Sequence, residues 1–167
     1  MDGRTIQTMP DANIQILRKE TYLKAIENSV GSRLFNSVFV KFKDSGKTAD
    51  ILNDGMYSCA FFVSSLLYLF QAIDKPHATV ANVMKFLETN EKWHKVDGGN
   101  NEAGDVIFWE KIVFDDGSEN AHIGFAVSKD EAVSTDYKQK LIARHPIIRE
   151  QTKRGIEAVY RYAWSEV

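Results

Sequence analysis

The sequence predicts an α+β fold, with helices in the first half of the chain and an antiparallel sheet of five or six strands after them. Apolar residues recur at helical spacing over the first half. The last third changes to apolar and β-branched runs separated by short turn clusters. With 167 residues, the chain is expected to form one domain, 1–167, with a helical N-terminal part at 1–53 and a core at 54–164.

Four helices are expected before the sheet. Residues 12–30 carry an apolar stripe with charges between, which predicts a surface helix. Ser32 is the expected N-cap of a second helix with an apolar stripe over 34–42. Residues 57–73 are apolar nearly all round, which indicates a helix buried on several sides and central to the fold. A fourth helix is expected at 79–88.

Five runs in the last third are expected to be strands. The connections between them are too short for crossover helices, so the strands should form an antiparallel meander. The runs are 105–114, 121–127, 132–136, 141–148 and 156–164.

Composition and charge exclude several function classes. The 21 basic and 23 acidic residues nearly balance, so no nucleic-acid partner is expected. The longest apolar stretch, 59–70, is far below the ~20 residues that a membrane span needs. The N-terminus carries no secretory signal, so we expect a cytoplasmic protein, or a cell-wall or extracellular one if a signal was removed. Nothing in the sequence indicates an oligomeric state.

Cys59 is the candidate nucleophile. As the single cysteine, it forms no internal disulfide and no cysteine-rich zinc site. A turn signal at Asp54 and Gly55 and an N-cap at Ser58 predict that Cys59 lies in the first turn of a helix. Backbone N–H groups and the helix dipole lower a thiol pKa there. Alternatively, Cys59 is a buried, inert cysteine, because an apolar run follows it.

His122 is the candidate base, because a thiol nucleophile needs an imidazole to accept its proton. Strand alternation puts His122 on one face with Gly124 and Ala126, whose small size leaves room for a helix terminus. Alternatively, His122 is a half-exposed, inert histidine near a strand end.

Ser134 and Asp136 are the candidates for the group that orients the imidazole. They share one face of the next strand, and Asp136 is preferred because a carboxylate is the better partner for an imidazolium. Alternatively, Asp136 is a solvated turn residue. His145 precedes a proline on an expected edge strand and comes next in line.

No metal and no cofactor are expected. The four histidines show no HExxH pairing, and neither GxxxxGK[ST] nor GxGxxG occurs. His77 and His94 are expected to be surface residues.

Three segments, in this order, resemble the signatures of the NlpC and CHAP papain-like cysteine peptidases and amidases. They are SCAFFVS at 58–64, AGDVIFW at 103–109 and AHIGF at 121–125. The resemblance spans about residues 54–163 and implies a papain-like fold with Cys59 as nucleophile and His122 as base.

The resemblance also implies a third catalytic position in the strand after His122. Counting along the sequence reaches Ser134, with Asp136 one pleat further. Members of the family often have Asp-Cys-Ser-Gly where this chain has SCAF at 58–61, so the surroundings of the thiol are bulkier than usual, which leaves the substrate open.

The implied activity is thiol-dependent hydrolysis of an amide or peptide bond, with a peptide or a peptidoglycan fragment as substrate. Two alternatives remain. One is a catalytically silent binding module on the same fold. The other is an intracellular cysteine peptidase or acyltransferase that uses the same cysteine and histidine.

Overall fold

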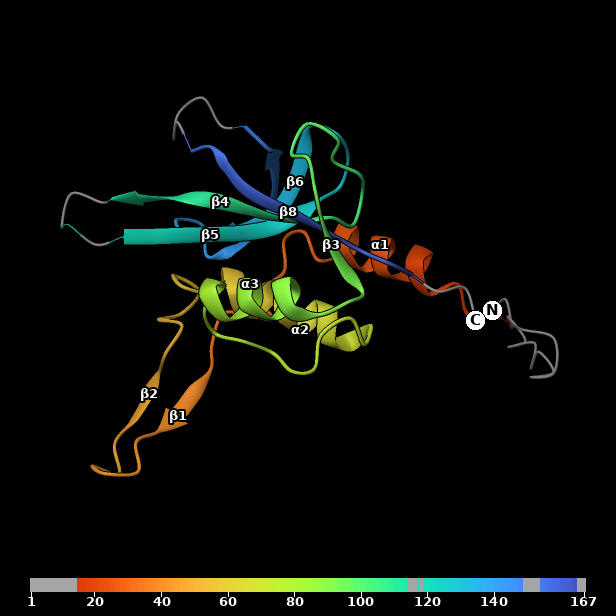
Figure 1. Ribbon diagram of the computed structural model, residues 1–167. Coiled ribbons are helices and arrows are strands. Elements are labelled where there is room, and N and C mark those ends of the chain that lie inside the picture. The colour runs from red at the N-terminus through yellow and green to blue at the C-terminus, as the bar shows by residue number, and fades with distance from the viewer. Residues whose placement is uncertain (1–14, 114–116, 118, 149–153, 165–167) are drawn as a thin grey trace, which may run out of the picture.

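Three helices, a six-stranded sheet and a two-stranded sheet make up the part of the chain that the computed structural model describes (Figure 1). This part covers residues 15–113, 117, 119–148 and 154–164. All paired strands are antiparallel. The predicted α+β class and the antiparallel sheet are confirmed.

The large sheet has the strand order β3-β8-β4-β5-β6-β7. Strands β4 to β7 form the expected meander, but β8 returns to pair with β4 and β3 instead of β7. The prediction of a simple meander is therefore wrong at its last strand. The strands are β3 (Trp93–Val96), β4 (Val106–Val113), β5 (Glu119–Ala126), β6 (Glu131–Asp136), β7 (Leu141–Pro146) and β8 (Ile156–Tyr162).

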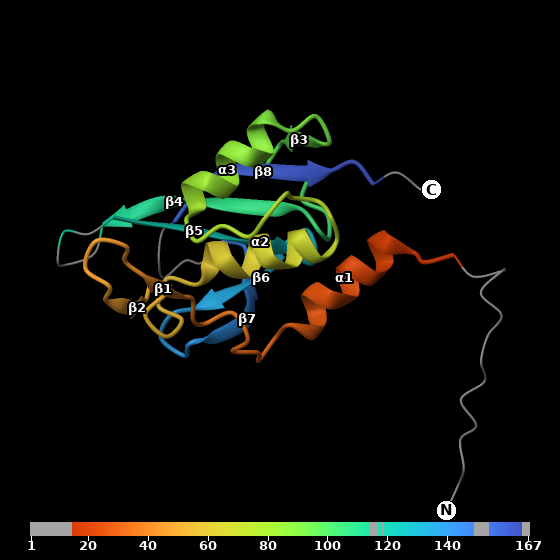
Figure 2. The same cartoon turned by 90° about the horizontal axis from the view of Figure 1, so that it is seen from below.

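The helices α1 (Arg18–Asn28), α2 (Cys59–Leu69) and α3 (Val80–Thr89) lie on one face of this sheet, with α2 between the other two (Figure 2). Helix α2 packs at the centre, where Phe62 meets Phe125 of β5 edge to face with ring centroids 5.6 Å apart. This agrees with its apolar sequence. Within the described segments, none of the helices is long and apolar enough to cross a membrane.

A smaller apolar cluster lies on the opposite face of the sheet, away from the helices. Because neighbouring residues of a strand point to opposite faces, His122 and Ser134 share this second face. The cluster on this face consists of Ile107, Trp109, Ala126, Ala132, Ile147 and Val159. The candidate base therefore lies over a small core of its own, and not under α2.

The expected second helix at 34–42 is wrong. Strand β1 (Phe39–Lys41) pairs there with β2 (Thr48–Asp50), and Gly46 in the turn has φ +69°. The apolar stripe fails as a helix signal because most of it is not covered by the core: Leu34 and Phe39 are 78% and 77% exposed, and only Phe35 packs against α2. The N-terminal part is thus a helix and a projecting hairpin (Figure 1).

Helix α1 is shorter than the expected 12–30, and residues 12–14 lie outside the described part. It docks on the entry to β4, where the Tyr22 hydroxyl donates to the Gly104 carbonyl at 2.8 Å. Gly104 has φ +93°, and a Cβ there would lie 2.8 Å from Leu23 and 2.9 Å from Tyr22. Only a glycine allows this close approach.

Candidate active site

A tightly held loop leads into Cys59. Asn53, Asp54 and Gly55 all have positive φ, at 50°, 50° and 90°, so the predicted turn is present. The Asp50 carboxylate organises the loop by accepting three backbone N–H groups. These hydrogen bonds lower the pKa of Asp50 to about 2. The donors are Val38, Leu52 and Asp54, at 2.9, 3.0 and 2.9 Å.

The same loop is tied to the turn between β6 and β7. The Gly55 N–H donates to the Asn36 carbonyl at 2.7 Å, and the Asn36 side chain donates to the Lys140 carbonyl at 2.8 Å. Lys140 in turn forms an ion pair with Asp54 at 2.7 Å. Backbone strain held by several contacts of this kind is common at functional sites.

Ser58 takes the N-cap position of α2, as expected, but its hydroxyl does not cap the helix. It donates instead to the Gly55 carbonyl at 3.0 Å. The N–H groups of Cys59 and Ala60 interact with the Cys59 sulfur. The sulfur thus interacts with N–H groups at the start of α2, where a side-chain oxygen of the N-cap residue normally accepts hydrogen bonds.

The Ile123 N–H of β5 also interacts with the Cys59 thiol and lowers its pKa. Strands β5 and β6 pair only from Gly124 to Ala126, so α2 begins beside the half of β5 that β6 does not cover. The Ile123 nitrogen is bonded to the carbonyl carbon of His122. The fold therefore brings the thiol to the strand position of the candidate base.

Burial raises the pKa of the Cys59 thiol, and this is the largest effect on it. The three backbone N–H groups and the positive charge of Arg154 act in the opposite direction. The sequence-based expectation of a lowered thiol pKa is therefore wrong, because desolvation outweighs the helix N-terminus.

The His122 ring is held by Ser134. Its Nε2 lies 2.9 Å from the Ser134 hydroxyl oxygen, which lies 2.6 Å from Nε2 of His145. Gly124 is the register partner of Ser134, and Ala132 is that of His145, so each pair is a diagonal neighbour across two strands. The structure thus aligns three polar side chains across β5, β6 and β7.

Asp136, the preferred orienter, lies elsewhere. Its carboxylate accepts the N–H groups of Lys138 and Gln139 at 2.9 and 3.0 Å, which makes it a turn residue at the end of β6. The β5–β6 pairing stops before it would bring Asp136 opposite His122. The structure places Ser134 at the imidazole instead.

Trp109 is the site residue that the sequence reasoning missed. It is the register partner of His122, and its ring lies against His122 and His145 with centroids 5.3 and 5.7 Å apart. Its indole N–H donates to the Ile147 carbonyl at 2.8 Å, which fixes the ring. The strand pattern of AGDVIFW carried the signal, but only the register shows which histidine Trp109 faces.

The room expected beside Gly124 is already filled. A Cβ on Gly124 would lie 2.7 Å from the Val133 carbonyl, 2.8 Å from Ser134 Cβ and 3.1 Å from the Trp109 ring. The absence of a side chain at Gly124 therefore allows β5, β6 and the Trp109 indole to pack closely around the imidazole. The space does not admit the helix terminus that the sequence had suggested.

Asp105, from the AGDVIFW segment, forms a buried ion pair with Arg161 and does not take part in the candidate site. It is 1% exposed, and both carboxylate oxygens accept from Arg161 of β8 at 2.8 Å. Arg161 also pairs with Glu102 at 2.6 Å. The motif therefore joins the start of β4 to β8.

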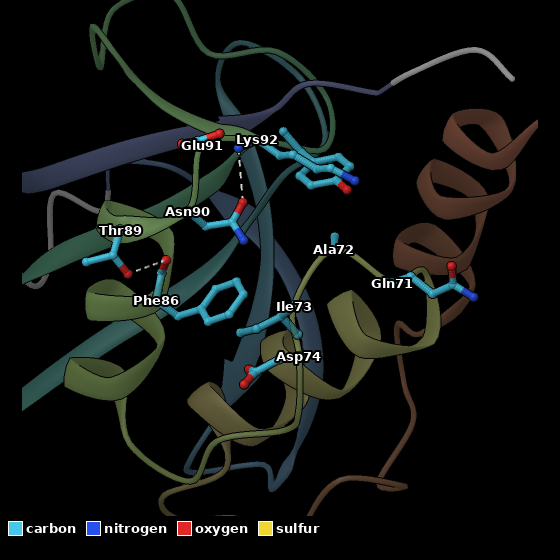
Figure 3. Close-up of a pocket in the computed structure, with 10 residues that line it drawn as sticks. Gln71, Ala72, Ile73, Asp74, Phe86, Thr89, Asn90, Glu91 and Lys92 are labelled. Carbon is cyan, nitrogen blue, oxygen red and sulfur yellow. Dashed lines mark hydrogen bonds between the residues drawn. The ribbon is translucent and has the colours of Figure 1, made fainter.

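A separate hollow of about 560 Å³ lies at the far ends of α2 and α3 (Figure 3). It is lined by Ile73, Phe86, Glu91 and Lys92, among others. Cys59 begins α2, so the helix alone separates the two by roughly 15 Å. Among the described residues, no three His, Cys, Asp or Glu side chains come together as a metal-binding group.

Comparison of the chain with protein-family models and with curated proteins finds no match to either. The resemblance to the NlpC and CHAP enzymes therefore rests on the three motifs and their order.

Proposed function

We propose that the chain is a thiol-dependent hydrolase of an amide or peptide bond, with Cys59 as nucleophile and His122 as base. The observation that carries this proposal is the interaction of the Ile123 N–H with the Cys59 thiol, since Ile123 directly follows His122 on β5. The buried Ser134 hydroxyl supports it by holding the imidazole. A nucleophile, a base and a group that orients the base are the parts that acyl transfer needs.

The reaction proceeds in two steps. The Cys59 sulfur bonds to the carbonyl carbon while His122 takes the thiol proton, and the C–N bond then breaks as His122 protonates the leaving amine. Water next attacks the thioester while His122 accepts its proton. The C–S bond breaks, the acid leaves, and the thiolate regains the proton from His122. Because burial raises the pKa of the Cys59 thiol, we assign its deprotonation to the attack step, with His122 as the proton acceptor.

The uncapped start of α2 supplies the donors for the oxyanion. The N–H groups of Cys59 and Ala60 lie at the sulfur, and the Ser58 hydroxyl does not occupy them. Fixed backbone donors of this kind stabilise the charge that develops on a carbonyl oxygen during attack.

The resemblance supports a peptide amide as substrate, in peptidoglycan fragments or in other peptides. A catalytically silent binding module is the second candidate. The raised pKa of the Cys59 thiol favours it, because a protonated, desolvated thiol is a weak nucleophile without base assistance.

A thiol-directed acyl probe with a reporter leaving group tests the proposal. Labelling of Cys59 followed by turnover is expected, and His122→Ala should slow labelling on the order of 10²-fold or more. His94→Ala is the matched control, because His94 is exposed on β3. Labelling without turnover, or at the same rate in His122→Ala, would support the silent module and overturn the proposal.

A further inference from the structure

The hydrogen-bonded chain from His122 through Ser134 to His145 does more than orient the His122 ring, because it also limits which ring nitrogens can carry a proton. Its two distances are 2.9 and 2.6 Å, both within hydrogen-bond range. Ser134 in the middle is completely buried. A buried hydroxyl has a single proton to donate, so the two histidines cannot both receive it.

The far end of the line fixes the tautomer of His145. Its Nδ1 lies 2.8 Å from the Pro146 carbonyl oxygen, which can only accept a hydrogen bond. The His145 Nδ1 therefore carries the proton. In the neutral ring, Nε2 then has the lone pair and accepts from Ser134.

The direction of the Ser134 hydroxyl then determines the tautomer of His122. Once the Ser134 proton points to His145, its oxygen can only accept from His122, so Nε2 of His122 carries a proton. The lone pair of His122 is left on Nδ1. This is the form in which Nδ1 can take a proton from a thiol.

The packing around the line keeps it from rearranging. The Trp109 ring lies against both imidazoles, and its own N–H is bonded to the Ile147 carbonyl. Gly124 lets Ser134 and Trp109 approach β5 without a side chain between them.

We propose that His145 is a positioning residue which, through the Ser134 hydroxyl, holds His122 in the tautomer whose Nδ1 accepts the Cys59 proton. The tautomers follow from the hydrogen bonds alone. Only the last step, proton transfer from Cys59, rests on the proposed function.

Nitrogen-15 spectra of the histidine rings test the tautomers directly in the full chain, with no substrate. At about pH 8, where an ordinary imidazole is neutral, His122 should be protonated at Nε2 and His145 at Nδ1. A His122 ring protonated at Nδ1, or a His145 ring protonated at both nitrogens, would overturn the proposal.

Two variants of His145 give opposite results. In His145→Phe the Ser134 proton loses its acceptor and turns to Nε2 of His122, which moves the His122 proton to Nδ1. In His145→Gln the amide oxygen can replace the lost acceptor and keep His122 protonated at Nε2. His94→Phe is the matched control and should leave the His122 signals unchanged. An unchanged His122 tautomer in folded His145→Phe would contradict the relay.

Alkylation of Cys59 links the tautomer to the proposed chemistry. His145→Phe should slow it about tenfold or more, because base assistance is lost. Adding Ser134→Ala to His145→Phe should restore part of the rate, because it removes the hydroxyl that imposes the wrong tautomer. A merely structural role predicts that the double variant is worse than either single one.

The relay and the proposed function fail in different ways. If the tautomers change as stated but the probe is never turned over, the relay stands and the hydrolase proposal fails. If Cys59 turns the probe over and the spectra of His145→Phe do not change, the hydrolase stands and the relay is overturned.

Discussion

The pKa of Cys59 is subject to opposing effects: burial, the largest, raises it, while backbone N–H groups and a nearby positive charge lower it. Arg154 supplies that charge, and its guanidinium donates to the Asn120 carbonyl of β5 at 3.0 Å. Its place near the thiol depends on β8 returning beside β4 and was not readable from local sequence.

Removing the Arg154 charge should make the thiol harder to ionise. In Arg154→Gln the pKa of Cys59 rises further, so the pH profile of alkylation moves to higher pH and the rate at about pH 8 falls roughly two- to fivefold. Iodoacetamide kinetics over a pH series measure both. Arg144→Gln, an exposed site on β7, is the control. A profile that is the same in Arg154→Gln and the unmodified chain would contradict the role of the charge.

Gly124 should tolerate no side chain. In Gly124→Ala the new methyl group meets the Val133 carbonyl at 2.7 Å, so β5 and β6 must move apart. We expect a loss of about 1–3 kcal/mol in the free energy of unfolding and a weaker His122–Ser134 contact. Urea unfolding measures the loss. Gly99→Ala, where a Cβ has no neighbour within 4 Å, should cost far less, and equal losses would argue against the close packing.

At the scale of elements, the expected helix at 34–42 shows what periodicity cannot decide. An apolar stripe marks a helix only when a core covers it, and here only Phe35 packs on the core while Leu34 and Phe39 are exposed. By contrast, Thr79 caps α3 through the Asn82 N–H, as local sequence can specify. The five expected strands are present because their alternation and turn signals are local. Strand β3 pairs only with β8, at the edge of the sheet, and was not among the five expected runs.

In the candidate site, too, some residues can be predicted from local sequence and others depend on long-range packing. Cys59 and His122 stand out in local motifs, and Ser134 was within reach by counting. The choice between Ser134 and Asp136 depended on where β6 leaves β5, and the part of Trp109 and His145 depended on register across three strands. Register of this kind is set by long-range packing and not by neighbours in the chain.

The β1–β2 hairpin should contribute little to the stability of the fold. Residues 41–49 are all exposed, and an isolated two-stranded hairpin is marginal in water. Replacing residues 42–47 with Asn-Gly, a two-residue turn between Lys41 and Thr48, should change the free energy of unfolding by less than about 0.5 kcal/mol. Thermal and urea unfolding measure this. A large loss would mean that the hairpin packs on the core.

At the scale of the whole molecule, Tyr22 joins the N-terminal helix to the rest of the core. Its ring meets Phe70, Phe125 and Trp164, and its hydroxyl bonds to the Gly104 carbonyl. Burial, together with the charge of Asp105, raises its pKa well above the ordinary value. A phenol of this kind links the ionisation of one side chain to the folding of the whole chain.

The raised pKa of Tyr22 predicts alkaline unfolding. Below about pH 10 the phenol is protonated in both states, so its contribution is complete. Above about pH 10 the unfolded chain loses the proton first, and the free energy of unfolding falls as the pH rises. Tyr160, whose pKa is raised to about 12, acts in the same direction.

Tyr22→Phe separates the two roles of the hydroxyl. The variant should lose about 1 kcal/mol near neutral pH, because the hydrogen bond to Gly104 is gone. Its stability should then fall less steeply above about pH 10, because phenylalanine cannot ionise. Urea unfolding over a pH series measures this, in a Cys59→Ala background so that the thiol does not contribute. If both chains lose stability equally above about pH 10, folding does not hold the Tyr22 proton.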